Sequence, residues 1–242
     1  MPNRNLPLVV GAALGALMLI AGDVLILGNP VDPAAHPLFT EVYADQLAPE
    51  LSLPLVSAPT DALVAARLLI AACVPLLCCG VWLTARTLRM AEGWYRTASF
   101  AALFAAVVLS PLLHSTLAFV GEVLKLVEHT EPSAHPALLE TANTFIMVFY
   151  VGWGLAMLLF TVAWLNVAVM VFRGRTSLPR WSGITTPLFG MMIVIAIINV
   201  LPDGVSAPVS GAGLSIAYLL FFTLLGTVFR GRLAASAEPS PS

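Results

Sequence analysis

Four residues that carry a charge or a polar hydrogen-bonding group interrupt otherwise apolar stretches of this sequence: Asp23, Arg67, His114 and Asn199. An ionisable side chain in hydrocarbon is costly, by roughly 2.5–3.5 kcal/mol on insertion scales, so it normally faces a cavity or a partner. At 1.5 Å per residue, Asp23, His114 and Asn199 lie roughly 22–24 Å from the more basic end of their stretches. Arg67 reaches the same depth when counted from the other end. The sequence therefore predicts one polar layer that faces the interior of a helix bundle.

Acid–base chemistry is the reaction type that these residues support. A carboxyl group surrounded by hydrocarbon favours its protonated form, so Asp23 or Glu122 could hold a proton for delivery to an alkene or an epoxide. His114 could then orient or reprotonate that acid. We therefore take Asp23, Glu122 and His114 as the candidate catalytic residues. The candidate substrate-binding residues lie at or near the same level, and they are Arg67, Asn143, Asn199, Ser215 and Tyr218.

A second interpretation of the polar layer is purely structural. Asp23 and Arg67 could form an ion pair that holds two helices together, with His114 hydrogen-bonded to a carbonyl group or to Asn199. Such a pair would also keep Asp23 ionised, and Glu122 would then be the better acid. The sequence alone leaves both interpretations open.

Metal, cofactor and nucleic-acid chemistry find no support in the sequence. Cys73, Cys78 and Cys79 fall in one apolar run without the paired spacing of a zinc site. His129 and His135 have a spacing that matches neither one helix face nor a known loop pattern. Walker, dinucleotide-binding, HExxH and nucleophile-elbow motifs are absent from the sequence. With 11 Lys and Arg against 13 Asp and Glu, the chain has no basic excess for nucleic acid. We therefore expect no cofactor, metal or nucleic-acid partner.

The composition is that of a membrane protein. Of the 242 residues, 59% are hydrophobic and only 10% are charged, whereas about a quarter of a soluble domain is charged. A transmembrane helix needs about 20 apolar residues. Six segments qualify: Leu8–Leu27, Ala62–Thr84, Ala98–Val120, Thr141–Val171, Gly183–Leu201 and Val209–Phe229. We expect an all-α bundle of six transmembrane helices within residues 1–233, followed by a disordered tail at 234–242. The apolar length of the first segment favours a retained span over a cleaved signal peptide.

The distribution of arginine predicts the orientation of the bundle, because cytoplasmic loops retain Lys and Arg. Nine of the 11 positive residues fall at alternate ends of the six segments: Arg4, Arg86, Arg89, Arg96, Arg173, Arg175, Arg180, Arg230 and Arg232. The other ends carry mostly Asp and Glu. We therefore expect both termini to be cytoplasmic and the opposite, acidic face to lie outside.

The longest connection, residues 28–61, is rich in proline and is predicted to lie on the outer side. Within it Leu38, Phe39, Val42, Tyr43 and Leu47 recur near helical spacing, which predicts a short interfacial helix. Such a helix could cover the outer ends of the bundle, either as a functional lid or as a simple anchor at the lipid headgroups.

Small residues form a stripe on the first predicted span. Gly11 and Gly15 make a GxxxG pair with Gly22 near the same stripe, so another helix can approach closely. That helix could belong to the same chain or to a second copy in a homodimer. The sequence contains no internal repeat, and a transporter built on this chain would need a second copy to supply the missing half.

Several short motifs resemble those of a bacterial family of multi-pass membrane proteins without an assigned function. They are Gly22-Asp23, Arg67-Leu68, His114, the loop from Gly174 to Trp181, and Thr186-Pro187. The resemblance covers most of the chain and implies a six-helix protein of the bacterial inner membrane, but it implies no activity. In size and in its intramembrane acidic groups the chain is also similar to membrane-bound terpene cyclases and sterol-isomerase-like proteins. No motif of those proteins matches here residue by residue.

Three functions remain open. The first is an intramembrane acid–base enzyme, of isomerase or cyclase type, that takes a lipidic or isoprenoid substrate from the bilayer. The second is a transporter or binder of small solutes that uses the same polar layer. The third is a non-catalytic membrane subunit in which the layer only specifies helix packing. Membrane lipids are expected to be partners in all three.

Overall fold

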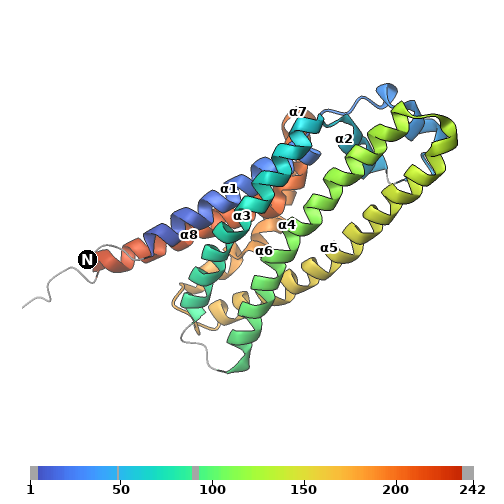
Figure 1. Ribbon diagram of the computed structural model, residues 1–242. Helices are drawn as coiled ribbons and strands as arrows, with labels where there is room; N and C mark the ends of the chain where they lie inside the picture. Colours follow the sequence, from blue (N-terminus) through green and yellow to red (C-terminus); the bar gives the residue numbers. More distant parts are fainter. Residues whose placement is uncertain (1–4, 48, 89–92, 236–242) are drawn as a thin grey trace, which may run out of the picture.

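The computed structural model describes residues 5–47, 49–88 and 93–235, and in this part of the chain every regular element is a helix. Figure 1 shows long helices side by side in one elongated bundle. The long helices are α1 (Leu6–Leu27), α3 (Thr60–Thr87), α4 (Trp94–His129), α5 (His135–Phe172) and α8 (Gly213–Ala235). The shorter α-helices are α2 (Pro49–Ser57), α6 (Pro187–Ile198) and α7 (Asp203–Val209). Short 3₁₀-helical and π-helical segments include η1 (Pro33–Ala35), η2 (Leu38–Val42), η4 (Pro132–Ala134), η5 (Arg180–Thr185) and η6 (Ser210–Ala212).

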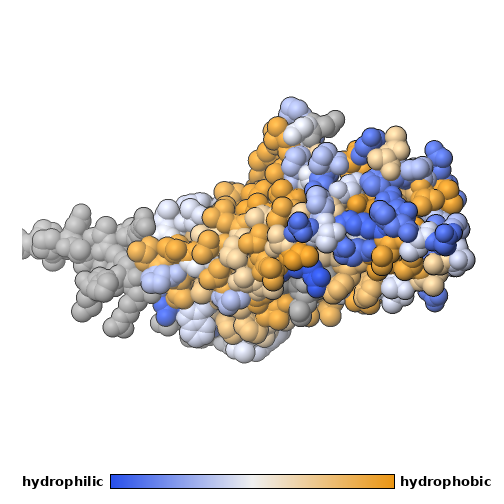
Figure 2. Space-filling model, turned by 45° about the horizontal axis from the view of Figure 1, so that its top comes forward, coloured by the Kyte–Doolittle hydropathy of each residue, from blue (hydrophilic) through white to orange (hydrophobic). Residues whose placement is uncertain are grey.

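The prediction of an all-helical membrane protein fits this architecture. Among the described residues, four helical stretches are long and apolar enough to cross a bilayer: Leu6–Leu27, Thr60–Thr87, Pro132–Phe172 and Gly204–Val228. Two further stretches are apolar but shorter, Trp94–Ser110 within α4 and the whole of α6. On the face that Figure 2 shows, apolar residues cover the middle of the molecule, and hydrophilic residues gather toward the end where α4 and α5 are joined.

The fifth predicted span, Gly183–Leu201, is not one long helix. Residues 180–185 form the 3₁₀ helix η5, and α6 has only 12 residues, which is about 18 Å. Pro187 begins α6 because its fixed φ suits the first helical position and its missing N–H is not needed there. After Ile198 the chain turns and reaches Pro202, which begins a new helix. The predicted span therefore consists of η5, the short helix α6 and a turn, and Pro202 follows it directly.

Helix α1 packs closely on α3 through its small residues. A Cβ atom on Gly15 would lie 2.8 Å from Leu76 Cβ and 2.9 Å from the Leu77 backbone nitrogen, and one on Gly22 would meet Ile70. The stripe predicted from the sequence is thus occupied by a helix of the same chain. Helix α8 packs on the other side of α1, and α4 lies between α3 and α5.

The α4–α5 hairpin extends beyond the other helices (Figure 1). With 36 and 38 residues, α4 and α5 are about 54 and 57 Å long, more than the roughly 45 Å of a bilayer with its headgroups. Residues 33–57, which we call the cap, pack against this projecting end. Phe39 and Leu55 of the cap are completely buried. The predicted interfacial helix corresponds to the single turn η2, and the cap also contains α2, which the sequence analysis did not predict.

Replacement of Gly15 by alanine tests the contact between α1 and α3. Alanine is the better helix former, so Gly15→Ala would stabilise an isolated helix. In the bundle its methyl group overlaps the α3 backbone, and overpacking of this kind costs about 1–3 kcal/mol. We expect a lower thermal unfolding temperature in detergent for G15A. Gly154→Ala is the matched control, because a Cβ atom at Gly154 meets nothing within 4 Å. Equal unfolding temperatures for the two variants would contradict the contact.

Candidate functional site

Asp23 is the centre of a buried polar cluster to which three helices contribute. Its Oδ2 atom accepts a hydrogen bond of 2.5 Å from Ser215 Oγ, and its Oδ1 atom lies 3.2 Å from His114 Nδ1. Asp23 belongs to α1, His114 to α4 and Ser215 to α8, and all three side chains are buried. We call these residues the Asp–His–Ser cluster. Its members are far apart in the sequence, so only the folded bundle brings them together.

The local sequence explains why Asp23 points into the bundle. Gly22 faces α3, where a Cβ atom would meet Ile70. The next residue on a helix is rotated by about 100°, so Asp23 turns away from this contact toward α4 and α8. Ser215 lies in the first turn of α8, and Asp23 lies in the last turns of α1. The cluster is therefore near the capped end of the bundle rather than at its centre.

An aromatic side chain that the sequence analysis missed completes this site. Trp153 on α5 stacks on the His114 ring with 5.3 Å between centroids, and Phe149 stacks on Trp153 at 5.8 Å. Gly152 allows α5 to pack closely against α4 at this point, because a Cβ atom there would lie 2.2 Å from Leu113 Cδ2 on α4. A tryptophan between Gly152 and Gly154 is a signal that could have located the contact.

Two buried polar atoms in this region retain hydrogen-bonding capacity. The Oγ atom of Ser110, one turn before His114, has no hydrogen-bond partner in the described part of the chain. His114 Nδ1 is close enough to Asp23 for an ion pair but is not aligned with it as a hydrogen bond. Buried polar groups are normally hydrogen-bonded, so unused capacity next to a carboxylate marks a candidate site for chemistry.

The order of the three groups determines which chemistry is possible. In a hydrolytic triad the imidazole lies between the hydroxyl and the carboxylate, where it removes the hydroxyl proton. Here the carboxyl group of Asp23 lies between the serine hydroxyl and the imidazole. Ser215 therefore acts as a hydrogen-bond donor rather than as a nucleophile. Asp23 and His114 lie 3.2 Å apart, so a small rotation of the imidazole ring would let them share one proton, which suits proton transfer.

Arg67 does not belong to this cluster. Its guanidinium Cζ lies 4.1 Å from the centroid of the Phe119 ring on α4, and the side chain is only half-buried. The ion pair between Asp23 and Arg67, which was one of the two interpretations of the polar layer, is therefore not formed. The reason is rotation about the helix axis, because Ala66 faces α1 and the next residue, Arg67, faces outward.

Glu122 also lies outside the cluster. Lys125 Nζ is 3.0 Å from Glu122 Oε1, and Thr60 Oγ1 donates to Glu122 Oε2 at 3.3 Å. The Glu122 side chain is 39% exposed. It therefore forms a partly solvated ion pair at the start of α3, and the structure does not bring it together with Asp23 or His114.

The remaining predicted site residues are dispersed. Asn199 is exposed directly after the end of α6, so the prediction that it faces the interior was wrong. The predicted depth of Asn199 assumes a helix that begins at Gly183, but α6 begins four residues later, at Pro187. Asn143 is exposed on α5 and lines a shallow groove next to the cap. Tyr218 is buried one turn after Ser215, and its ring packs edge-on against Trp164 at 6.3 Å.

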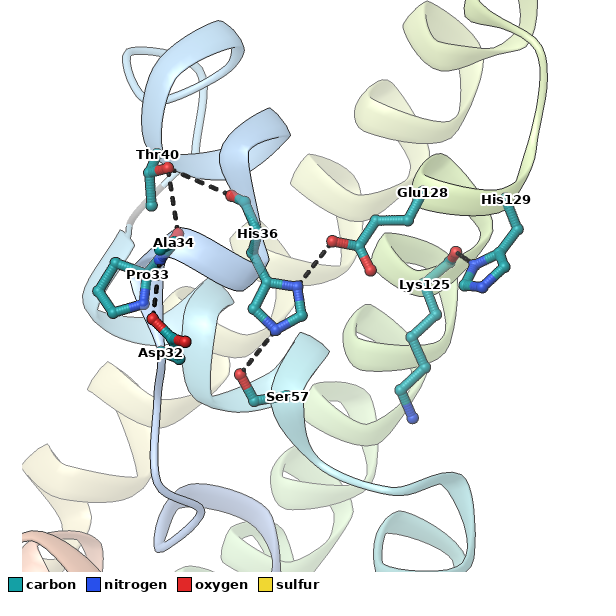
Figure 3. Close-up of polar contacts among 9 residues, drawn as sticks. All are labelled: Asp32, Pro33, Ala34, His36, Thr40, Ser57, Lys125, Glu128 and His129. Carbon is teal, nitrogen blue, oxygen red and sulfur yellow. Dashed lines mark hydrogen bonds and ion pairs between the residues drawn. The ribbon is translucent and has the colours of Figure 1, made fainter.

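A second polar cluster joins the cap to α4, as Figure 3 shows. His36 Nδ1 lies 2.7 Å from Glu128 Oε1, and its Nε2 atom lies 3.0 Å from Ser57 Oγ. His129 turns away and lies 2.7 Å from the Lys125 carbonyl oxygen. His129 therefore does not converge with His36.

His135 is engaged separately. Its Nδ1 atom lies 2.8 Å from the Tyr43 hydroxyl, and its Nε2 atom lies 3.1 Å from the Thr130 carbonyl oxygen. His129 and His135 thus have different partners. Among the described residues, no group of three His, Cys, Asp or Glu side chains could hold a metal ion.

Removal of the Glu128 carboxylate should loosen the cap. Glu128→Ala takes away the charged partner of His36, and a hydrogen bond to a charged group contributes about 1.5–3 kcal/mol. We expect amide hydrogens of residues 33–57 to exchange at least about tenfold faster in E128A. Glu131→Ala removes an exposed carboxylate nearby and is the matched control. Identical exchange in the two variants would contradict the role of the ion pair.

Comparison with known proteins places the chain in a family. No curated protein and no solved structure matches the sequence. A family model described as a family of unknown function, DUF6796, matches residues 1–229, which include all three members of the Asp–His–Ser cluster. The match confirms the expectation of a family without an assigned function. Because it covers nearly the whole sequence, the chain belongs to the DUF6796 family.

Proposed function

We propose that this protein is an enzyme of the bacterial cell membrane that crosses the bilayer six times and transfers a proton to and from a lipidic substrate at the Asp–His–Ser cluster. The observation that carries the proposal is the contact of a buried carboxyl group with a buried imidazole inside an apolar bundle. Large apolar side chains exposed on α5, such as Val151 and Leu158, support burial of the bundle in lipid.

Contacts between three segments at one end of the bundle support the orientation in this proposal. Arg86 at the end of α3 donates a hydrogen bond to Asn5 at the start of α1. The backbone N–H of Ser177 donates to the Thr87 carbonyl at 3.0 Å. The start of α1, the end of α3 and the arginine-rich loop after α5 therefore share one end of the bundle. This is the end that the arginine distribution assigns to the cytoplasm.

The path from α6 to α8 supports an even number of crossings. Helix α6 leaves the basic end but is about 18 Å long, short of the roughly 30 Å apolar core. Helix α7 then continues toward the opposite end, where Gly28 packs against Pro208. We take α6 and α7 together as the fifth crossing and α8 as the sixth.

Fusions to a reporter enzyme test the orientation. Alkaline phosphatase is active only outside the cytoplasm, so we expect an inactive fusion after Arg232 and an active fusion at Asp45 in the cap. The nine positive residues at one end give the physical reason. An active fusion after Arg232 would refute the proposed orientation.

An isomerisation or a cyclisation of a double-bonded lipid suits the cluster because such a reaction consumes no net proton. The protonated Asp23 carboxyl group would add its proton to an alkene carbon and leave a carbocation. His114 would remove a proton from a neighbouring carbon, forming the new double bond. The proton would then return from His114 to Asp23 across the 3.2 Å contact. No co-reactant is required for this cycle.

The surroundings of the cluster support a cationic form of His114. Trp153 stacks on His114, and the face of an indole ring attracts positive charge, so it would stabilise the imidazolium that forms when His114 takes a proton. Ser215 donates to Asp23 and would hold its carboxyl group in one orientation while protons are exchanged. These contacts favour an enzyme over a subunit in which the polar layer only fixes packing, because packing alone needs no aromatic face beside the pair.

Replacement of Asp23 by asparagine separates chemistry from folding. The amide oxygen can accept from Ser215 and the amide N–H can donate to His114, so Asp23→Asn should retain the fold and its thermal stability. The amide cannot supply the proton, and loss of an acid–base group lowers rates by about 10²–10⁴-fold. We expect cells that carry D23N to share the altered lipid species of a deletion strain in mass-spectrometric lipid analysis. Asp45→Asn, on an exposed carboxyl group of the cap, should restore the wild-type lipids.

The outcome distinguishes the three functions. A change in the chemical species of a lipid supports the enzyme, whereas a change only in its distribution between leaflets indicates transport. If folded D23N restores the wild-type lipids, the acid–base reaction is refuted. If D23N fails to fold and His114→Gln folds with normal lipids, the cluster is a packing device.

A further inference from the structure

Arg67 is the one charged member of an apolar groove on the outward face of α3. The groove is lined by Val64, Leu68 and Ala71 together with Arg67. The guanidinium lies over the Phe119 ring of α4, which in turn stacks on an aromatic ring of α5. Leu68 is 68% exposed, so this surface faces acyl chains when the bundle lies in a bilayer.

The charge of Arg67 lacks an anionic partner in the described part of the chain. Asp23 contacts His114 and Ser215, and Glu122 contacts Lys125. The ring of Phe119 offers only the partial negative charge of its face. A guanidinium in hydrocarbon is too costly to remain without a counter-charge, so an anion from outside the chain is expected at this position.

The groove lies close to the level of the lipid headgroups. Glu122 follows Phe119 by three residues, which is about 4.5 Å along α4. Its contacts with Lys125 and with Thr60, the first residue of α3, mark where polar side chains begin. A long arginine side chain can extend from the apolar region toward this level.

We propose that Arg67 binds the phosphate of an anionic phospholipid in the outer leaflet, with an acyl chain along Val64, Leu68 and Ala71. The planar guanidinium presents parallel N–H donors that fit two phosphate oxygens, which an ammonium group does not. A zwitterionic headgroup carries its own ammonium beside the phosphate, and this ammonium offsets part of the negative charge with which Arg67 would pair. An anionic headgroup such as that of phosphatidylglycerol carries no such ammonium.

This site is independent of proton transfer at the Asp–His–Ser cluster, because Arg67 does not contact Asp23. Its test is a measurement of binding rather than of turnover. A failure of lipid binding therefore leaves the proposed reaction intact, and the reverse also holds.

Native mass spectrometry of the full chain in detergent tests the site with phosphatidylglycerol, phosphatidylethanolamine or inorganic phosphate as the added ligand. We expect the wild-type protein to retain one phosphatidylglycerol molecule more tightly than phosphatidylethanolamine. Arg67→Gln should weaken phosphatidylglycerol binding about tenfold. Arg67→Lys should weaken it less, because lysine keeps the positive charge but lacks the parallel N–H donors of the guanidinium. Arg96→Gln removes an exposed arginine at the basic end and is the matched control with wild-type binding.

Three results would overturn the proposal. The first is equal binding of phosphatidylglycerol by R67Q and the wild type, or by R67K and the wild type if R67Q does not fold. The second is an equal loss in R67Q and R96Q, since only net charge would then matter. The third is inorganic phosphate that displaces the lipid at equal concentration, because the apolar groove would then contribute nothing.

Discussion

The close contact of α1 with α3 is the constraint on which the buried polar cluster depends. Gly15 and Gly22 leave no side chain between these helices, and α3 fills the space. Asp23 follows Gly22 and is rotated by about 100° away from α3, so it faces α4 and α8. A larger residue at position 22 would push α1 away from α3 and shift Asp23 relative to Ser215. The chemistry of the carboxyl group thus rests on a packing contact one residue away.

Burial then limits what can stabilise Asp23. Hydrocarbon offers no hydrogen bonds, so the partners of a buried carboxyl group must come from the protein. The Ser215 hydroxyl can donate to Asp23 in either protonation state of the carboxyl group, whereas the His114 imidazole can either give or take a proton. The cluster can therefore gain or lose a proton while the serine hydrogen bond persists. A fixed arginine–carboxylate pair would not have this property, because arginine remains protonated in proteins.

Depth along a helix could be predicted from the sequence, but direction around the helix axis could not. Residue counting gives Asp23 and His114 the same depth, since each residue adds a constant rise, but their contact also requires both side chains to face the interior. Arg67 has a suitable depth but faces outward, because its direction depends on Ala66 packing against α1. The predicted position of Asn199 was wrong because α6 begins at Pro187, after the start of the apolar segment. The helical class was predictable from the apolar runs themselves, whereas the cap depends on long-range contacts such as His36 with Glu128.

The outward position of Arg67 also leaves Asp23 free of a permanent counter-charge. Ala66 and Ala118 precede Arg67 and Phe119 on α3 and α4, and both are buried and small. The buried residues thus point into the bundle, whereas Arg67 and Phe119 meet at the lipid-facing groove, apart from the Asp–His–Ser cluster. Binding of a headgroup at Arg67 then needs no change in the bundle, because the groove is already open to lipid. At the boundary between α4 and α5, by contrast, Trp153 stacks on His114, so under the proposed function a lipidic substrate that enters there would approach Asp23 beside an aromatic ring.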